Sequence, residues 1–527
     1  MLRAMVFCLL CFNLAACTNN DSGDSDKPNF HRPIELLHDT LGAYEWNIST
    51  SNTRAQEYFR QGMQMRWGYN MPEAARSMAE ARRLDTDCAM CYWGEAFALG
   101  SFLNAGMNAK KAGYAHAAIT KAAELVATNG TQVEKDLIAA AQVRYPEDYD
   151  PKNRRPVDQA FADEMAKVYK KYPNHHEVAT VYAVALFLLE ERRGYRDLAA
   201  PALMHLHSVL LGVLNEDIKH PGACHLYIHA TESSPEPERA LKCAKFIGDA
   251  IPGGSHIQHM PSHTWNEVGL WGQSVKANIR AVHVDLKSKS GGGASYAPSH
   301  NLHMLVFSAS FDGQGAIAVQ AAKDYAKITK NSMYHVLTLL RFNRFDEIAA
   351  VTNKPKDEVP AGLWEFAQGY AAMRNGNDTE ARRYLKSVQS TASSSDKNFR
   401  GHPAKHLLGS VGKILEGELQ LKSGELDAAI ASFQVSVELE DELNYDEPEP
   451  LPFTPRHWLG AALLQAKRYQ DAELVYREEL KDHPHNGWSL IGLQQAIQAQ
   501  GKSDSDVDQD LEASWARSDI WATSSRF

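Results

Sequence analysis

"RHWLGAALLQAKRYQDAELVYREELKDHP", residues 456–484, places small and aromatic residues at fixed intervals within two amphipathic segments. Gly460 and Ala472 are small, Tyr476 is aromatic, and Pro484 closes the stretch. In a helix–turn–helix unit, small residues at such positions let two helices approach closely, and an aromatic ring fills the gap between them. The stretch therefore predicts a pair of packed helices.

The same spacing recurs at two other places in the chain. The matching positions are Gly62, Ala74, Met78 and Ala81 within residues 55–88, and Gly417, Ala429 and Phe433 in the C-terminal half. Three matches in register indicate tetratricopeptide (TPR) repeats, which stack side by side into a solenoid. We therefore predict an all-α fold, an α-solenoid of TPR-like helix–turn–helix repeats.

The middle of the chain is helical too, but less regular. Residues 157–172, 177–193 and 200–214 carry apolar residues at helical spacing, and no stretch shows the sustained alternation of a strand. Breaks such as DEPEPLPFTP (446–455) separate the helices. We expect a signal peptide (1–16), a lipidated cysteine with its tether (17–45), N-terminal repeats (46–219), a histidine-rich segment (220–310) and C-terminal repeats (311–527).

The N-terminal end, MLRAMVFCLLCFNLAAC, has the pattern of a bacterial lipoprotein signal. Arg3 precedes an apolar run (4–14) too short to span a bilayer, and LAAC ends in Cys17 as a small-residue cleavage site. The pattern predicts lipidation of Cys17; the alternative is an ordinary signal peptide with an incidental cysteine. Residues 18–29 are polar and acidic, which indicates a flexible tether.

The residue after Cys17 is Thr18 rather than aspartate, which favours the outer membrane over the inner one. We therefore expect a protein of the bacterial cell envelope, held by its lipid anchor on the periplasmic face of the outer membrane. No other apolar run approaches membrane-spanning length, so the membrane attachment rests on the lipid alone.

Composition and motifs argue against several classes of function. The net charge is −10 at a sequence pI of about 6.1, and no basic block marks a nucleic-acid surface. The sequence lacks Walker A, Rossmann glycine, Gly-x-Ser-x-Gly and HExxH patterns. We therefore expect neither nucleic acid nor nucleotide among the partners, and no zincin-type hydrolysis.

Four cysteines remain once the signal peptide and Cys17 are set aside: Cys88, Cys91, Cys224 and Cys243. In an oxidising compartment an even number favours disulfides. For CAMC (88–91) we predict a local Cys88–Cys91 disulfide. A metal site is disfavoured, because the chain has no second CxxC. Two unpaired thiols are the alternative, and Cys224, next to His225, is also a candidate soft metal ligand.

Histidines gather between His225 and His303, where eight of the chain's 22 lie. Seven of these eight, all but His283, fall in three motifs, HLYIHATE (225–232), HIQHMPSH (256–263) and SHNLHM (299–304). In the first motif two histidines one turn apart and Glu232 share a helix face, a spacing at which two imidazoles can bind one metal ion. In the second, Pro261 either begins a helix or kinks a longer one.

Each motif lies at the start of an expected helix, about one repeat from the next. Because equivalent helices of successive repeats stack side by side, we expect the motifs to converge on one inner surface. The predicted metal ligands are His225, His229, Glu232, His256, His259, His263, His300 and His303. The alternative is that these are surface or core histidines, as we expect for His205, His207, His220 and His283.

These ligands exceed the needs of one tetrahedral ion, so the site can hold one or two. Imidazole suits zinc, copper, iron and nickel alike. Met260, Met304 and the expected periplasmic setting favour copper, with iron or zinc as alternatives.

HLYIHATE, HIQHMPSH, SHNLHM, CAMCYWGEA (88–96) and the C-terminal RHWLGAALL together resemble a family of bacterial TPR-repeat proteins, mostly secreted or lipid-anchored. The family typically shows HYYIHAxE, HxxHMPxH and HNxH blocks. The resemblance implies the same eight ligand positions, but no settled activity. Relatives often carry a glutamate in YAEAL where this chain has Val184 in YAVAL, which puts the metal content or chemistry of this chain in doubt.

Three functions are consistent with these features. The first is a metalloenzyme with Glu232 as ligand or general base, for which oxidative chemistry is favoured over hydrolytic. The second is a metal-binding or delivery protein without turnover. The third is a TPR scaffold that binds a peptide or protein partner in its groove.

Overall fold

The computed structural model describes residues 34–37, 40–191, 194–289, 291 and 293–527. Within these residues the chain is almost wholly α-helical, which confirms the predicted fold class, and one two-residue strand pair accompanies the helices. None of the helices described is long and apolar enough to cross a membrane. The predicted signal peptide, Cys17 and the first part of the tether lie outside the described residues.

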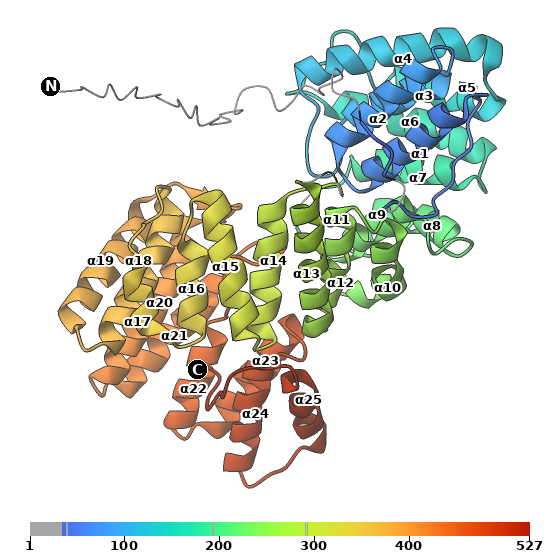
Figure 1. Cartoon of the computed structure of the whole chain (residues 1–527). Coiled ribbons are helices and arrows are strands. Elements are labelled where there is room, and N and C mark those ends of the chain that lie inside the picture. The colour runs from blue at the N-terminus through green and yellow to red at the C-terminus, as the bar shows by residue number, and fades with distance from the viewer. Residues whose placement is uncertain (1–33, 38–39, 192–193, 290, 292) are drawn as a thin grey trace, which may run out of the picture.

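The N-terminal block consists of helix pairs preceded by an extended strap, residues 40–50 (blue to teal in Figure 1). Side-chain caps start several of its helices: Asn52 accepts hydrogen bonds from two backbone N–H groups of the first turn of α1, and Thr131 and Glu134 form a capping box on α5. The helices are α1 (Thr53–Trp67), α2 (Met71–Leu84), α3 (Ala89–Leu99), α4 (Ala109–Asn129), α5 (Gln132–Gln142), α6 (Arg155–Lys171) and α7 (His176–Phe187).

The central segment, green in Figure 1, connects the N-terminal block to the rest of the chain. Its shorter helices begin at the Pro- and Gly-rich breaks that the sequence shows. They are α8 (Pro201–Leu214), α9 (Pro221–Thr231), the 3-10 helix η1 (Pro237–Ala240), α10 (Leu241–Ala250), α11 (Ser255–His259), α12 (Pro261–Glu267), α13 (Trp271–Ser288) and α14 (Pro298–Phe311).

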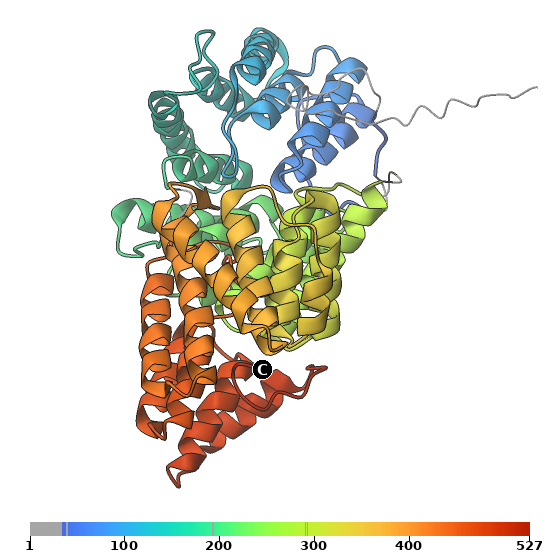
Figure 2. The same ribbon diagram turned by 90° about the vertical axis from the view of Figure 1, so that its left-hand side faces the viewer.

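The C-terminal repeats curve away from the central segment and return beneath it (Figures 1 and 2). They comprise α15 (Gly315–Thr329), α16 (Met333–Arg341), α17 (Phe345–Ala350), α18 (Glu358–Arg374), α19 (Asp378–Ser394), β1 (Asn398–Phe399), β2 (His402–Pro403), α20 (Ala404–Lys422), α21 (Leu426–Asp441), α22 (Arg456–Gln465), α23 (Tyr469–Asp482), α24 (Gly487–Ala499) and α25 (Ser505–Trp515). The strands β1 and β2 pair antiparallel.

The C-terminal repeats return to the central segment, where their last helices contact α13 and α14. The Trp271 indole N–H of α13 donates to the Pro484 carbonyl at 2.9 Å, and that of Trp488 on α24 donates to the Ser310 carbonyl of α14 at 2.9 Å. These bonds hold α23 and α24 beside α13 and α14, so the loop 443–455 lies close to the central segment.

The small residues of the repeat pattern stand where two helices meet, as predicted. A Cβ at Gly460 would lie 2.3 Å from the Tyr476 ring, and one at Gly417 would lie 2.5 Å from the Phe433 ring. At the N-terminal end a Cβ at Gly62 would lie 2.6 Å from the Met78 side chain. The aromatic or methionine side chain of each second helix therefore packs directly on the backbone of the first.

Replacing Gly460 by alanine should destabilise the C-terminal repeats, because the added methyl group and the buried Tyr476 ring cannot occupy the same space. Overpacking of this kind costs about 1–3 kcal/mol. Urea unfolding followed by circular dichroism measures the change. Gly113→Ala is the control, since a Cβ at Gly113 would meet nothing within 4 Å. Gly424→Ala is unsuitable, because Gly424 has a φ of +82° that alanine rarely adopts. Equal stability of Gly460→Ala and the wild type would contradict this packing.

Residues 519–527 lie along the inner face of the C-terminal repeats. Arg341, buried in α16, donates to the carbonyls of Ser525 at 3.4 Å and Arg526 at 3.2 Å. The Ser525 hydroxyl donates to the His457 carbonyl at 2.7 Å. The Phe527 ring meets three aromatic rings edge-on, those of Phe345, Tyr370 and Trp458. The chain's own residues thus cover this part of the groove in which a peptide partner was expected.

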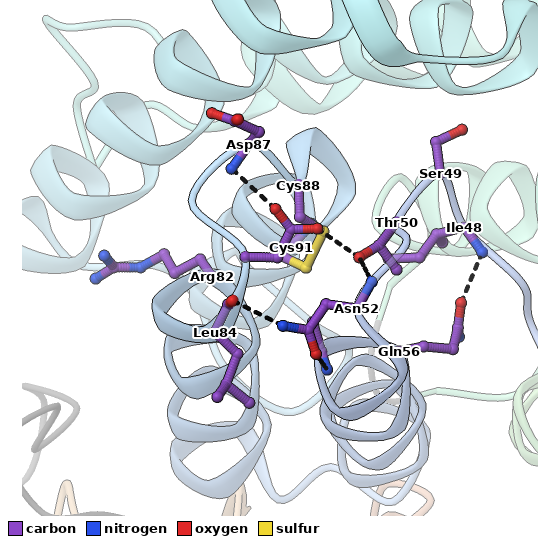
Figure 3. Close-up of a disulfide and its surroundings, with 12 residues drawn as sticks. Ile48, Ser49, Thr50, Asn52, Gln56, Arg82, Leu84, Asp87, Cys88 and Cys91 are labelled. Carbon is purple, nitrogen blue, oxygen red and sulfur yellow. Dashed lines mark hydrogen bonds between the residues drawn. A yellow bond between two sulfur atoms is a disulfide. The ribbon is translucent and has the colours of Figure 1, made fainter.

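Two disulfides join the four cysteines of the described residues. The predicted Cys88–Cys91 bridge lies at the start of α3, next to Thr50 of the strap and Asn52, the cap of α1 (Figure 3). Cys224 of α9 pairs with Cys243 of α10. The suggestion that Cys224 binds a metal was therefore wrong, because its sulfur is bonded to another cysteine.

Candidate metal centre

The three histidine motifs converge at the junction between the N-terminal block and the C-terminal repeats (Figure 1). They come from α9, from α11 and α12, and from α14. A carboxylate from the loop 443–455 joins them. Among the described residues seven histidines and glutamates of the predicted set fall into close groups, namely His225, His229, Glu232, His256, His259, His263 and His300.

Helix α9 presents its histidines on one face. Pro221 occupies its first turn, and His220 caps it by accepting a hydrogen bond from the Ala223 N–H at 3.1 Å. One turn separates His225 from His229, and each is only 1 % exposed. The predicted shared face is therefore confirmed, and it points into the protein.

Pro261 divides the second motif without changing its direction. Helix α11 ends at His259, Met260 keeps helical dihedral angles, and α12 begins at Pro261. The two short helices thus continue one another, with His256 and His259 before the break and His263 after it. Both expectations for Pro261 hold in part: it begins a helix, and it interrupts a longer one.

The first triad consists of His225, His229 and His256, whose ligand nitrogens lie within 4.8 Å of one another. The Nδ1 of His225 lies 2.6 Å from the Trp67 carbonyl. Because a carbonyl can only accept, this Nδ1 carries the proton and the Nε2 lone pair of the neutral ring is free for a metal. That Nε2 faces the Nε2 of His256 at 3.2 Å.

The second triad, His259, His263 and His300, repeats this arrangement. The Nδ1 of His259 lies 2.8 Å from Oδ1 of Asn278, whose amide nitrogen donates to the Ser274 carbonyl and so fixes which atom faces the histidine. The Nε2 atoms of His259 and His263 face each other at 2.8 Å. The His300 ring, from α14, lies 4.6 Å from that of His259.

Two buried carboxylates lie between the triads. Oε1 of Glu232 accepts a hydrogen bond from Nδ1 of His229 at 3.0 Å, and its Oε2 lies 2.7 Å from Nδ1 of His263. Oε2 of Glu447 lies 3.2 Å from the same His263 nitrogen. Burial alone would lower the pKa of His263, but these carboxylates raise it to about 9. These four residues also form a third group close enough to hold an ion.

Burial keeps His225, His256, His259 and His300 neutral. Burial lowers the pKa of His225 to about 3, and burial together with His263 lowers that of His259 to about 3. Burial also holds the pKa values of His256 and His300 well below the ordinary value. Neutral imidazole is the form that binds metal, so burial favours the ligand state of these rings.

The spacing of the facing nitrogens suits a metal ion. Two nitrogens about 2.0 Å from a tetrahedral ion lie about 3.3 Å apart. The 3.2 Å between Nε2 of His225 and of His256 is close to this span. The 2.8 Å between His259 and His263 is shorter, as expected where the protonated His263 donates to its neighbour in place of a metal.

The triads adjoin, but their surroundings differ. The His229 and His263 rings lie 5.2 Å apart across the gap between them. Tyr69, in the left-handed conformation at φ 57°, places its ring 4.2 Å from that of His225 and closes the first triad. By contrast, His263 of the second triad lines a cavity of about 810 Å³. Only the second triad therefore has a residue in the wall of this cavity.

The structure does not bring His303 into the cluster. It lies one turn beyond His300 on α14, where its ring stacks on Tyr334 at 4.1 Å, and it joins none of the three groups. Burial lowers its pKa well below the ordinary value, which fits a core histidine. Val184 lies near the first triad, since it lines a small cavity together with His225.

Sequence reasoning missed Glu447 and Tyr69. Glu447 lies in the proline-rich loop that was read only as a break between helices, although its acidic residues were a signal for a charged function. Tyr69 stands in the turn between α1 and α2, far from the motifs in sequence. No local pattern connects it with the histidines.

Comparison with known proteins gives only distant likenesses. No protein-family model and no curated protein sequence matches the chain. Similar solved structures include the human IFIT1 dimer with m7Gppp-AAAA (11% identity, 82% of this chain and 90% of that chain, TM-score 0.31) and the Cut9–Hcn1 hetero-tetramer of the APC/C (12%, 90%, 79%, 0.29). The TPR domain of P58(IPK) is a further example (11%, 85%, 98%, 0.21).

Scores this low do not establish a shared arrangement, so the assignment of TPR-like repeats rests on the helix packing of the chain itself. The resemblance to the bacterial TPR lipoprotein family remains a prediction.

Proposed function

We propose that this protein is a dinuclear metalloenzyme of the bacterial cell envelope, with one transition metal ion on each histidine triad. The observation that carries the proposal is that six histidines gather in two adjoining groups of three, and that in each group the Nε2 atoms of two histidines face each other. Buried polar clusters are costly unless a partner satisfies them. Two cations supply that partner.

Ligand chemistry favours copper. Each triad offers three imidazoles, which suit copper, zinc, iron and nickel. The carboxylate of Glu232 contacts Nδ1 atoms on the outer edges of His229 and His263. It therefore orients one ligand of each triad instead of taking a place on the ion, as outer-shell carboxylates do in other metal sites. Iron sites in helical bundles use carboxylate ligands more heavily, which makes iron the weaker choice.

The reaction takes place at the second triad, because His263 faces the cavity. A copper ion bound there supplies a redox-active Lewis acid. We infer an oxidation in which the substrate loses electrons and dioxygen accepts them, with zinc-dependent hydrolysis as the alternative. The enclosed first triad holds a resident ion, which argues against a delivery protein that must release its metal.

Oxygen consumption tests the reaction. Copper-loaded protein should consume dioxygen with ascorbate as electron donor, and zinc-loaded protein should not. The His259→Ala/His300→Ala variant should lose this activity while keeping the copper of the first triad. A fully copper-loaded wild type that consumes no dioxygen above the rate of free copper would rule out the oxidative reaction.

Replacing Glu232 by glutamine should weaken copper binding about 10–100-fold, the usual effect of losing an outer-shell partner. The amide keeps the shape of the side chain but not the charge that orients both histidines. Competition with a chelator measures the affinity. Glu95→Gln is the control, since Glu95 is a buried carboxylate paired with Arg82 elsewhere in the protein. Unchanged affinity in Glu232→Gln would mean that Glu232 does not orient the ligands.

The proposed location rests on the N-terminal sequence and on the cysteines. Two disulfides fit an oxidising compartment. In a bacterial host the full chain should fractionate with membranes, and Cys17→Ser should be released into the soluble periplasmic fraction or retain an uncleaved signal peptide. A wild-type chain found in the soluble fraction without lipid would contradict the anchor.

A further inference from the structure

The cavity beside the second triad is large and strongly acidic. It measures about 810 Å³ and lies between α12, α13, the loop 443–455 and α23. Pockets of this size accept small organic molecules. Among the described residues, ten acidic side chains line it, against three from lysine and arginine: Glu238, Glu267, Glu440, Asp441, Asp446, Glu447, Glu449, Glu478, Glu479 and Asp482, against Arg196, Arg456 and Lys481.

The three basic side chains are already engaged by the protein. Arg456 lies 2.8 Å from Asp441, and Lys481 pairs with Glu478. Arg196 donates to the backbone carbonyl of His229 at 3.3 Å. Other cationic groups engage further carboxylates of the wall: Asp446 pairs with Arg400, Glu447 with His263, and Glu449 and Glu479 with His483. Among the described residues, no cationic side chain pairs with Glu238, Glu267 or Asp482.

Glu267 shows the excess of negative charge in the cavity most clearly. It follows His263 by one helical turn, is partly buried, and has no hydrogen bond or ion pair with any described residue. Burial, and then Glu449 and Glu232, raise its pKa to about 8. A cation placed in the cavity would stabilise this carboxylate, because none of the described residues places a cationic group in contact with it.

The cavity is also lined by apolar and aromatic side chains. Trp271, Met304 and Phe307 line it, and Tyr195 meets Tyr445 edge-on near the same cavity, with Tyr195 81% exposed. Aromatic faces attract organic cations as well as apolar groups. The cavity lining thus combines acidic side chains, aromatic side chains and a histidine of the candidate metal centre, His263.

We propose that this cavity admits an organic cation, a molecule with an ammonium or guanidinium group on an apolar body, to the ion held by the second triad. The inference rests on the proposed function for the identity of the reacting site. The charge of the ligand is inferred from the cavity lining and does not depend on the proposed function. A metal ion alone would leave most of the volume and the aromatic side chains unused.

Three probes of similar shape and different charge test the inference. Isothermal titration of the copper-loaded protein compares 2-phenylethylammonium with neutral 2-phenylethanol and anionic 3-phenylpropionate. The cation should bind at least about fivefold more tightly than the alcohol, the effect of one close charge pair in water, and added salt should reduce the difference. Glu267→Gln should lose most of this preference, whereas Glu380→Gln should keep it, because Glu380 is a partly exposed carboxylate that pairs with Arg383 on α19.

Metal content measured on the same samples separates this inference from the proposed function. Two equivalents of copper with equal binding of all three probes would overturn the cation preference and leave the metal centre intact. Cation preference in a protein that binds no metal would support the cavity and overturn the metalloenzyme. More than two equivalents of copper, without preference among the organic probes, would mean that the cavity takes inorganic cations and would also overturn the inference.

Discussion

Replacing His225 and His256 together by alanine should lower the copper content of the protein from two equivalents to one. Both residues belong to the first triad, and their Nε2 atoms face each other at 3.2 Å. Without them His229 is the one histidine left in that group, and a single imidazole does not hold an ion against a chelator. The second triad keeps its three histidines. The expected loss is therefore one ion, with little change in the other.

The complementary variant, His259→Ala/His300→Ala, should also retain one equivalent, but that of the first triad. Inductively coupled plasma mass spectrometry gives the stoichiometry, and circular dichroism shows whether the helices persist. His207→Ala/His303→Ala is the matched control, because both residues are buried histidines outside the three groups. Loss of both ions in each variant would indicate one shared site, and loss of neither would remove these residues from the ligand set.

Removing residues 519–527 should destabilise the C-terminal repeats by roughly 3 kcal/mol or more. The segment supplies the carbonyl groups that Arg341 contacts, and Arg341 is only 1% exposed. Burial already lowers the pKa of this guanidinium well below its ordinary value. Without these acceptors the charge stays buried, with only the stacked Trp488 ring and the electrostatic attraction of Glu479 to offset its burial, a costly state for an ion. Removing Phe527 also uncovers the aromatic rings beneath it.

Urea unfolding followed by tryptophan fluorescence measures this effect, since Trp488 stacks on Arg341. Trp521→Ala is a control within the same segment: its side chain is 99% exposed and should contribute little. Addition of a synthetic peptide with the sequence of residues 519–527 should restore part of the lost stability. A truncated protein as stable as the wild type would show that the segment does not brace the repeats.

The repeat scaffold was predictable because its signal is local. Gly460 and Tyr476 recur at a fixed spacing, and the structure places one directly on the other. Convergence of the histidine motifs was predictable indirectly, from the predicted repeats, since stacked repeats bring equivalent helices together. His225, His229 and the second motif follow this rule, and they meet as expected.

The site predictions that failed concern features that residue spacing in the sequence does not determine. His300 and His303 are one turn apart, yet one faces the second triad and the other packs on Tyr334, because a neighbouring helix decides which side is the core. Glu447 reaches the site from a loop some 180 residues after His263, and only the return of the C-terminal repeats brings it there. Pairing of Cys224 with Cys243 likewise depends on how α9 and α10 lie together.

Anomalous X-ray diffraction at the copper edge, from crystals of the copper-loaded protein, tests the central claim most directly. Two peaks are expected, each about 2.0–2.1 Å from imidazole nitrogens, one within the first triad and one within the second. A single peak, a peak between Glu232 and Glu447, or no peak beside any of these histidines would contradict a pair of ions on two histidine triads.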